Sequence, residues 1–265
     1  MPFMWLYQLP VGVALPGFVI LFVAASLLIV IALRRWVPGD KKQMREWDRI
    51  LAYVMATFGV LYGVTLALIA AASYENYRGV EEIVRDEASA VAVLYRDTAG
   101  FPEPERGELQ ALIVSYVDHV REVDWEAQRE GRIPSQSVAE VAAIEDVLFS
   151  FEPEGEGEAN VHAAAIWSFN EFMSARSARI GVIGLELPGI LWFVLYSGAA
   201  ITAVLIGMIQ MGRLRTHLVM AAVLASYVAI VIFTIASFDH PYMGPVAVDT
   251  EYFEEVQEWL FDRAD

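Results

Sequence analysis

The chain has 265 residues, of which 57% are hydrophobic, and its formal net charge is −16. Soluble domains are usually about 45–50% apolar, so this excess favours a membrane protein. The acidic balance argues against nucleic-acid binding, which needs a basic face. The absence of cysteine excludes disulfides, thiol catalysis and cysteine-ligated metals.

The hydrophobic excess is concentrated in four blocks that contain no Asp, Glu, Lys, Arg or His. A helix rises about 1.5 Å per residue, so roughly 20 apolar residues cross the hydrocarbon layer of a bilayer. Each block has that length, and four of them in one short chain argue against the alternative of buried core helices. We therefore predict four transmembrane helices, at Leu15–Leu33, Leu51–Ser73, Leu187–Ile209 and Leu218–Phe238.

The first of these blocks is expected to be retained as a transmembrane helix. Met1–Ala14 contains no Lys or Arg, and the positive charges follow the apolar block. A secretory signal has the reverse layout.

Residues 74–186 form the predicted domain between the second and third spans. Apolar residues recur there at three- and four-residue spacing with charges between them, which is typical of amphipathic helices. The stretch EPEGEGE, Glu152–Glu158, is predicted to be an acidic loop. The four helices that we expect are Glu75–Thr98, Glu103–Gly131, Ser137–Phe151 and Ala159–Ile183.

The connections predict an all-α fold with this helical domain inserted between spans two and three. No helix breaker follows Ser73, so the second span should continue into the domain as one long helix. We expect Ala159–Ile183 to continue towards the third span in the same way. The tail should be extended, with Asp249 or Thr250 capping a short amphipathic helix at Glu251–Phe261. The predicted regions are 1–73, 74–186, 187–238 and 239–265.

The orientation in the membrane follows from the basic residues. The loop after the first span carries six Lys and Arg within residues 34–49, and the turn between spans three and four carries Arg213 and Arg215. The positive-inside rule places both short loops in the cytoplasm. We therefore expect a multi-pass cell-membrane protein whose N-terminus, central domain and C-terminal tail are extracytoplasmic.

Enzyme motifs do not emerge from the sequence. There is no P-loop and no Gly-x-Gly-x-x-Gly, and the four histidines lie far apart. The adjacent carboxylates Asp86–Glu87 and Glu254–Glu255 point about 100° apart on a helix, so we interpret them as solvated faces. We predict no catalytic residue, no metal site and no cofactor.

The second span carries two candidate features. Gly59 and Gly63 form a Gly-x-x-x-Gly pair, which lets two helices approach closely, although glycine is also simply tolerated in membrane helices. A mildly polar stripe on another face would line a pore in an oligomer, with two leucines as constrictions; an ordinary helix–helix contact is the alternative. The stripe consists of Thr57, Leu61, Thr65, Leu68 and Ala72.

Charged residues near the end of this span suggest two further contacts. Glu75 is either an ordinary interfacial group or, repeated around a symmetry axis, a carboxylate ring that influences ion selectivity. One interpretation of Arg176 and Arg179, three residues apart, is that they pair with acids of the first domain helix such as Asp86. The alternative is a surface pair of little energetic value.

Four segments resemble the bestrophin-like family of prokaryotic membrane proteins. They are LYGVTLALIAAASYENY, DEASAVAVLYR, FPEP and FDHPYMGPVAV, in matching order from Phe58 to Val248. The most specific parts are the tyrosine and acidic residues at the end of the second span, the Leu-Tyr-Arg helix and the Asp-x-Pro turn.

The family is distantly similar to bestrophins, which are oligomeric anion channels with two spans, a helical domain and two more spans. The resemblance implies that the second span lines a pore, at the stripe from Thr57 to Ala72. Two features depart from bestrophins. The basic residues place this domain outside the cell, and its nine Arg against 23 acids should attract cations and repel anions.

Two functions from different classes remain open at this point. The first is a homo-oligomeric ion channel whose partners are its own copies, the lipid bilayer and inorganic ions. The second is a membrane-anchored sensor or scaffold whose acidic domain binds cations or a partner. A symmetric oligomer with an axial opening would favour the channel, and a closed, lipid-tight dimer would favour the sensor.

Overall fold

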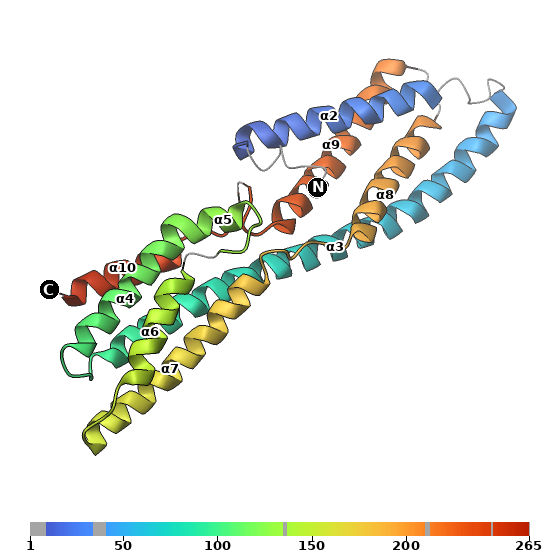
Figure 1. Cartoon of the computed structure of the whole chain (residues 1–265). Coiled ribbons are helices and arrows are strands. Elements are labelled where there is room, and N and C mark those ends of the chain that lie inside the picture. Colours follow the sequence, from blue (N-terminus) through green and yellow to red (C-terminus); the bar gives the residue numbers. More distant parts are fainter. Residues whose placement is uncertain (1–8, 34–40, 135–136, 210–212, 245, 265) are drawn as a thin grey trace. The chain divides into compact units, whose positions relative to one another are not determined.

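The computed structural model describes residues 9–33, 41–134, 137–209, 213–244 and 246–264, and this described part is helical without strands. The predicted all-α class is confirmed (Figure 1). The helices are α2 (Val11–Leu33), α3 (Lys41–Thr98), α4 (Glu105–His119), the π-helix η2 (Val120–Asp124), α5 (Trp125–Arg129), α6 (Val138–Ser150), α7 (Glu156–Gly181), α8 (Gly189–Gly207), α9 (Leu214–Asp239) and α10 (Glu251–Ala264).

Four of these helices are long and apolar enough to cross a membrane. They are α2, the part of α3 from Glu46 onward, α8 and α9. Each contains most or all of one predicted hydrophobic block, so the prediction of four membrane-spanning helices with a helical insertion between the second and third is confirmed.

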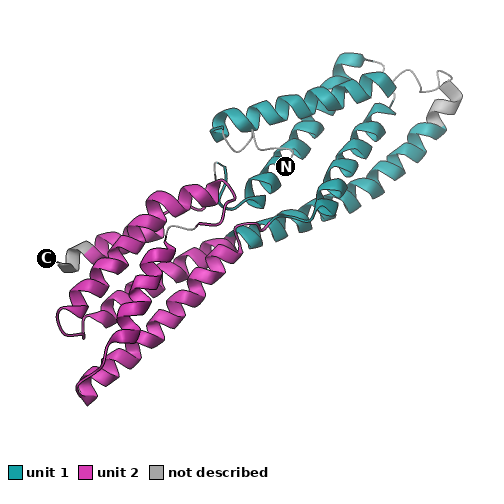
Figure 2. Cartoon of the chain, in the orientation of Figure 1, with its two compact units in different colours: residues 1–77, 186–246 teal, residues 78–185, 247–265 magenta. Residues whose placement is uncertain are grey.

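The chain divides into two compact units (Figure 2). Unit 1 comprises residues 1–77 and 186–246, and unit 2 comprises residues 78–185 and 247–265. Helix α3 supplies residues to both units. Unit 1 contains the other three membrane-spanning helices, and unit 2 contains α4 to α7 together with the C-terminal helix α10.

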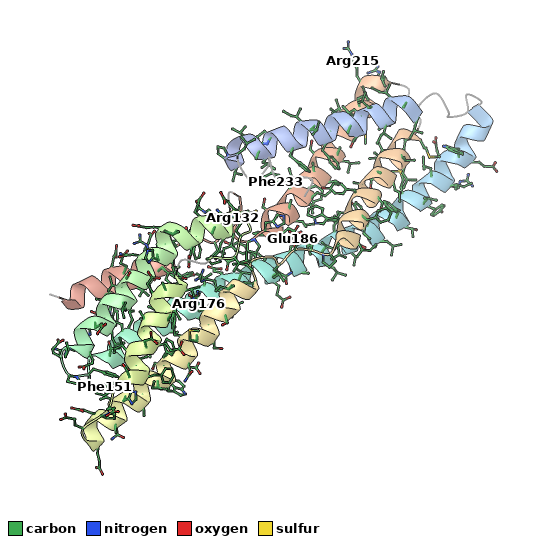
Figure 3. All side chains as sticks on the ribbon, viewed as in Figure 1. Arg132, Phe151, Arg176, Glu186, Arg215 and Phe233 are labelled. Atoms are coloured by element: carbon green, nitrogen blue, oxygen red, sulfur yellow. The ribbon has the colours of Figure 1, made fainter. Side chains whose placement is uncertain are left out.

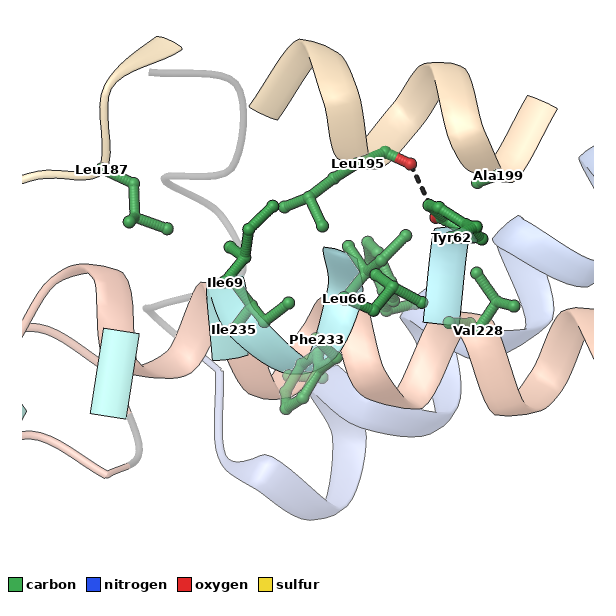
Figure 4. Close-up of a cluster of buried hydrophobic side chains, with 13 residues drawn as sticks. Tyr62, Leu66, Ile69, Leu187, Leu195, Ala199, Val228, Phe233 and Ile235 are labelled. Carbon is green, nitrogen blue, oxygen red and sulfur yellow. Dashed lines mark hydrogen bonds between the residues drawn. The ribbon is translucent and has the colours of Figure 1, made fainter. Parts of the chain in front are cut away.

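The core of unit 1 lies where α2, α3, α8 and α9 meet (Figure 4). The rings of Phe18 and Phe233 lie 5.9 Å apart, which joins α2 to α9. The Tyr62 hydroxyl donates a 2.8 Å hydrogen bond to the Leu195 carbonyl of α8. This bond satisfies a buried polar group in an otherwise apolar cluster, as burial requires.

Glycine sets the closest helix approaches in unit 1. A Cβ added at Gly198 would lie 2.1 Å from the Tyr62 ring, and one at Gly207 would lie 3.1 Å from the Val30 Cα. Helix α8 can therefore pack against α3 and α2 only because these two positions have no side chain. The approach resembles the small-residue packing of membrane helices.

The predicted continuity is confirmed for α3 and wrong for α7. Helix α3 runs without interruption for 58 residues. Helix α7 instead ends at Gly181, and α8 begins at Gly189 after Pro188, whose ψ of 134° is not helical. Gly184 and Pro188 both disfavour helix in this connection, since glycine costs backbone entropy and proline restricts the residue before it.

Two other helix boundaries in unit 2 differ from the prediction. The second half of the expected acidic loop is helical, because α7 begins at Glu156, where its first-turn carboxylates favour the helix dipole. The expected helix Glu103–Gly131 is interrupted by the π-helix η2. The predicted cap of the C-terminal helix is present, since Asp249 accepts a 3.1 Å bond from the Glu251 N–H.

The core of unit 2 is built from the predicted amphipathic stripes. On α3, Val80, Val84 and Val91 are buried. The C-terminal helix has its expected partner surface: Phe253 is fully buried, and its ring lies 6.1 Å from that of Trp125. The apolar face of α10 is thus part of the same core.

Candidate functional site

Helix α3 presents two different faces within unit 1. One face is buried against the rest of the unit. Its side chains recur at three- and four-residue spacing and are Tyr62, Leu66, Ile69 and Ser73. The opposite face has large apolar side chains that no described residue covers, including Val60 and Val64. A single chain therefore leaves one side of this span free for lipid, water or another copy.

The predicted pore stripe lies mostly on this exposed face. Leu61 is 63% exposed and Leu68 is 67% exposed. Thr65 is half-buried, and its hydroxyl donates a 2.9 Å bond to the Leu61 carbonyl in its own helix. The other predicted positions on the exposed face are Thr57, Ala72 and Glu75.

Gly59 and Gly63 also lie on exposed positions of α3. A Cβ added at either glycine would meet no atom within 4 Å among the described residues. Within the described part of the chain, the pair therefore does not mediate helix packing. The space beside it is open to a neighbouring molecule.

The environment of Glu75 is set by two flanking tyrosines. The rings of Tyr74 and Tyr77 lie 5.4 Å and 5.3 Å from the Phe238 ring at the end of α9. These contacts fix the rotation of α3 about its axis at this level. Glu75 itself is exposed, and it forms no ion pair within the described part of the chain.

Asp239, the last residue of α9, joins the ends of two spans. Its carboxylate accepts a 2.6 Å bond from the Leu187 N–H and a 3.2 Å bond from the Trp192 indole N–H. It thereby ties the connection before α8, and the Trp192 side chain in the first turn of α8, to the end of α9. We did not predict this role; the available signal was an acid directly after an apolar block.

A buried ion pair lies inside unit 2. Glu87 of α3 and Arg179 of α7 are both fully buried and pair directly, with Arg179 Nη2 donating to Glu87 Oε1 at 3.1 Å. The Tyr116 hydroxyl donates to the same carboxylate. The ring of Phe253 covers the guanidinium, with its centroid 5.9 Å from Arg179 Cζ.

Burial and charge act together on this cluster. Burial, reinforced by the neighbouring Glu87 carboxylate, raises the pKa of Tyr116 well above its ordinary value. Burial alone would disfavour the guanidinium cation, but the Glu87 carboxylate outweighs this and raises the pKa of Arg179. The cluster therefore combines the neutral phenol of Tyr116 with the ion pair of Glu87 and Arg179. All three side chains are buried away from solvent.

This cluster corrects one sequence prediction and confirms another in part. The predicted solvated face is wrong for Glu87, which lies on the buried stripe three residues from Val84 and four from Val91. Arg179 pairs with an acid of the first domain helix, as predicted, but that acid is Glu87, whereas the example Asp86 is exposed. Arg176, which Figure 3 labels, donates a 3.1 Å bond to the Ser137 hydroxyl and is not a surface residue.

Metal ligands do not cluster in the part of the chain that the structure describes. No group of three or more His, Cys, Asp or Glu side chains is arranged there to hold a metal ion. The His162 and His217 rings instead lie within hydrogen-bond distance of backbone carbonyls.

Comparison with known proteins identifies the fold and the family. A bacterial bestrophin homologue from Klebsiella pneumoniae matches with a TM-score of 0.64 and 13% identity, over 93% of this chain and 97% of that one. A single-substitution variant of the homologue from this organism gives a TM-score of 0.65 and 12% identity, over 94% and 98%. No curated protein sequence matches significantly. At this identity the structural matches establish the bestrophin fold.

The family model for the bestrophin-like domain matches residues 20–253, which is most of the chain. The matched region includes α3, α7 to α9 and the Asp239 turn, and so agrees with the resemblance seen in the sequence. The chain is a membrane protein that belongs to the bestrophin-like family.

Proposed function

We propose that the chain forms a homo-oligomeric ion channel in which the exposed face of α3 surrounds the axis. The observation that carries this proposal is the division of α3 into a face packed within unit 1 and a face with no cover. In an oligomer that face would meet its copies around an axis. The similarity to bestrophin homologues supports the same arrangement by fold.

Ion selectivity follows from the charges along the path. Leu61 and Leu68 would form apolar constrictions, and Glu75 would add a ring of carboxylates at the mouth. Such a ring concentrates cations and repels anions over distances shorter than the Debye length of about 8 Å at physiological salt. The carboxylate ring favours cation conduction, whereas the likeness to bestrophin anion channels favours anion conduction. A measurement of the reversal potential distinguishes the two.

Glu75→Arg should move the reversal potential towards the anion equilibrium value in bilayers with a salt gradient, because it reverses the charge of the ring. Leu61→Ala and Leu68→Ala should raise the conductance by widening an apolar constriction. Leu28→Ala, at an exposed leucine of α2, serves as the control. Purified protein that never conducts, with equally silent leucine variants, would contradict the channel.

The glycine pair provides an independent test of assembly. Gly59→Leu with Gly63→Leu should reduce the oligomer size in mild detergent, because the larger side chains would block close approach of a neighbouring α3. Mass photometry or light scattering measures the size. Gly189→Ala, at an open position on α8, is the matched control. An unchanged oligomer in the double variant would show that the pair plays no part in assembly.

We further propose that the N-terminus, unit 2 and the tail lie outside the cytoplasm. The basis is the six Lys and Arg of the loop after the first span, of which Arg34 and Arg35 lie outside the described residues. A cysteine tag within residues 37–42 should label only from the cytoplasm, and one at Gly155 only from outside. The chain has no native cysteine, so each tag reports a single site. The opposite pattern would give the orientation of bestrophins.

A sensor or scaffold is the second candidate function. The observation that favours it is that unit 2 is a compact helical unit with its own core and buried ion pair. A closed, non-conducting assembly whose unit 2 binds a partner would support this function over the channel.

A further inference from the structure

One end of the helix bundle in unit 1 carries basic residues. Helices α2 and α8 end there, and α3 and α9 begin there. The Trp47 indole N–H of α3 donates a 3.2 Å bond to the Met208 carbonyl at the end of α8. Nε2 of His217, on α9, lies 2.9 Å from the Ile206 carbonyl of α8. The beginnings of α3 and α9 therefore both lie beside the end of α8.

Residues 41–49 and 213–215 form what we call the basic end of unit 1. It contains six Lys and Arg against two acids, Glu46 and Asp48. This local excess of positive charge is the reverse of the formal net charge of the chain, which is −16. The basic residues are Lys41, Lys42, Arg45, Arg49, Arg213 and Arg215.

Arg213 and Arg215 lie at the start of α9. Both are exposed, and neither forms an ion pair within 4.0 Å among the described residues. The Arg215 side chain points away from the helices (Figure 3). Within the part of the chain that the structure describes, their guanidinium groups therefore have no charged partner.

The depth of Arg215 in a membrane follows from its place in the sequence. It lies three residues before the apolar block Leu218–Phe238, which is roughly 5 Å of helix from the edge of the hydrocarbon layer. The headgroup region of a bilayer extends about 5–8 Å beyond that edge. Trp47 lies at the same end of the bundle, and tryptophan is enriched at membrane interfaces. Arg213 and Arg215 are thus at the depth of the lipid phosphates.

An exposed apolar track leads from Arg215 along α9. Val219, Val223 and Tyr227 follow at four-residue spacing, which places them on one face of the helix. They are 63%, 65% and 67% exposed, respectively. The helix from Arg215 to Tyr227 rises roughly 18 Å, slightly more than half of the hydrocarbon layer of about 30 Å. The track therefore has the length of an acyl chain in one leaflet.

The opposite end of unit 1 has the reverse charge. Glu75 follows the second apolar block, Glu186 precedes the third, and Asp239 follows the fourth. The arginine that comes next along α3, Arg78, already lies 3.8 Å from the Glu82 carboxylate. Anionic headgroups are consequently attracted to the basic end and repelled from the other end.

We propose that Arg213 and Arg215 bind the phosphate of an anionic phospholipid, such as phosphatidylglycerol, whose acyl chain lies along the apolar track of α9. Guanidinium groups form paired hydrogen bonds with phosphate oxygens. Each Lys or Arg near a membrane surface adds roughly a fivefold preference for anionic lipid, so the rest of the basic end strengthens binding. A lipid fits this place better than free phosphate, because it covers the apolar track as well as the arginines.

The test titrates the full chain in mild detergent with dioleoylphosphatidylglycerol or dioleoylphosphatidylcholine, and native mass spectrometry counts the bound lipids. The wild type should bind phosphatidylglycerol roughly tenfold more tightly or better, and salt should weaken this preference by screening the attraction. Arg213→Gln with Arg215→Gln should remove most of the preference. An excess of inorganic phosphate should not displace the lipid, because phosphate has no acyl chain to occupy the track.

Arg96→Gln with Arg132→Gln is the matched control, because it removes the same charge from exposed positions of unit 2. It should keep the full preference. Val223→Asn, which makes the track polar, should weaken the binding of both lipids. The thermal unfolding midpoint without added lipid checks that each variant folds. If the double variant at Arg213 and Arg215 does not fold, Arg215→Gln alone should still lower the preference severalfold.

Equal affinity of the wild type for the two lipids would overturn the proposal, and so would a full preference in the folded arginine variants. Displacement by inorganic phosphate would assign the arginines to a free anion instead. A smaller oligomer in Val223→Asn, with lipid binding unchanged, would assign this face of α9 to a second copy of the chain. None of these results depends on whether the protein conducts, so they leave the channel proposal to its own test.

Discussion

Arg179→Met is expected to destabilise unit 2 by about 3–5 kcal/mol, because it leaves the Glu87 carboxylate buried without its counter-ion. Glu87→Met should lower the stability by a similar amount, because it leaves the Arg179 guanidinium buried without its counter-ion. Either change should appear as faster hydrogen exchange or proteolysis in α3 after residue 78, α4 and α7. Unit 1 has its own core, so its protection from hydrogen exchange and proteolysis should change much less.

The double variant Glu87→Met with Arg179→Met separates the value of the ion pair from the cost of breaking it. Replacing both charges by apolar side chains of similar size removes the desolvation cost, so the double variant should be more stable than either single variant. Arg106→Met, at an exposed ion pair with Glu103, is the control and should change stability little. Additive losses in the double variant would show that the two residues do not act as a pair.

Gly198→Ala should disrupt the packing of unit 1. The added Cβ would lie 2.1 Å from the Tyr62 ring, which is buried and held by its hydrogen bond to Leu195. Overpacking of this kind typically costs about 1–3 kcal/mol, because the ring or the backbone of α8 must shift. The thermal unfolding midpoint in detergent measures the loss.

Two variants provide the comparison for Gly198→Ala. Gly189→Ala lies on the same helix in open space and should be neutral. Tyr62→Leu combined with Gly198→Ala should recover part of the lost stability, because it removes the ring that the new methyl group meets. A stable Gly198→Ala variant would mean that α8 can move away from α3 at little cost.

The sequence by itself determined the membrane-spanning helices and the helical class. Uninterrupted apolar length and three- to four-residue periodicity are local properties, and they predicted the spans, the long helix α3 and the buried face of α10. The exposed stripe from Thr57 to Glu75 was also visible, because the positions on one helix face follow from spacing alone. What this face does in an assembly remains our proposal.

Only the tertiary structure decided which polar residues are buried and with what. Glu87 and Arg179 are 92 residues apart, and their pairing depends on how α3 and α7 pack. The same holds for Asp239 with Leu187 and for Gly198 with Tyr62. Sequence periodicity shows that Glu87 shares the apolar stripe of its helix, but a charge can be buried there only when a distant cation and phenol neutralise and solvate it. That condition is a property of the packed helices and of no single segment.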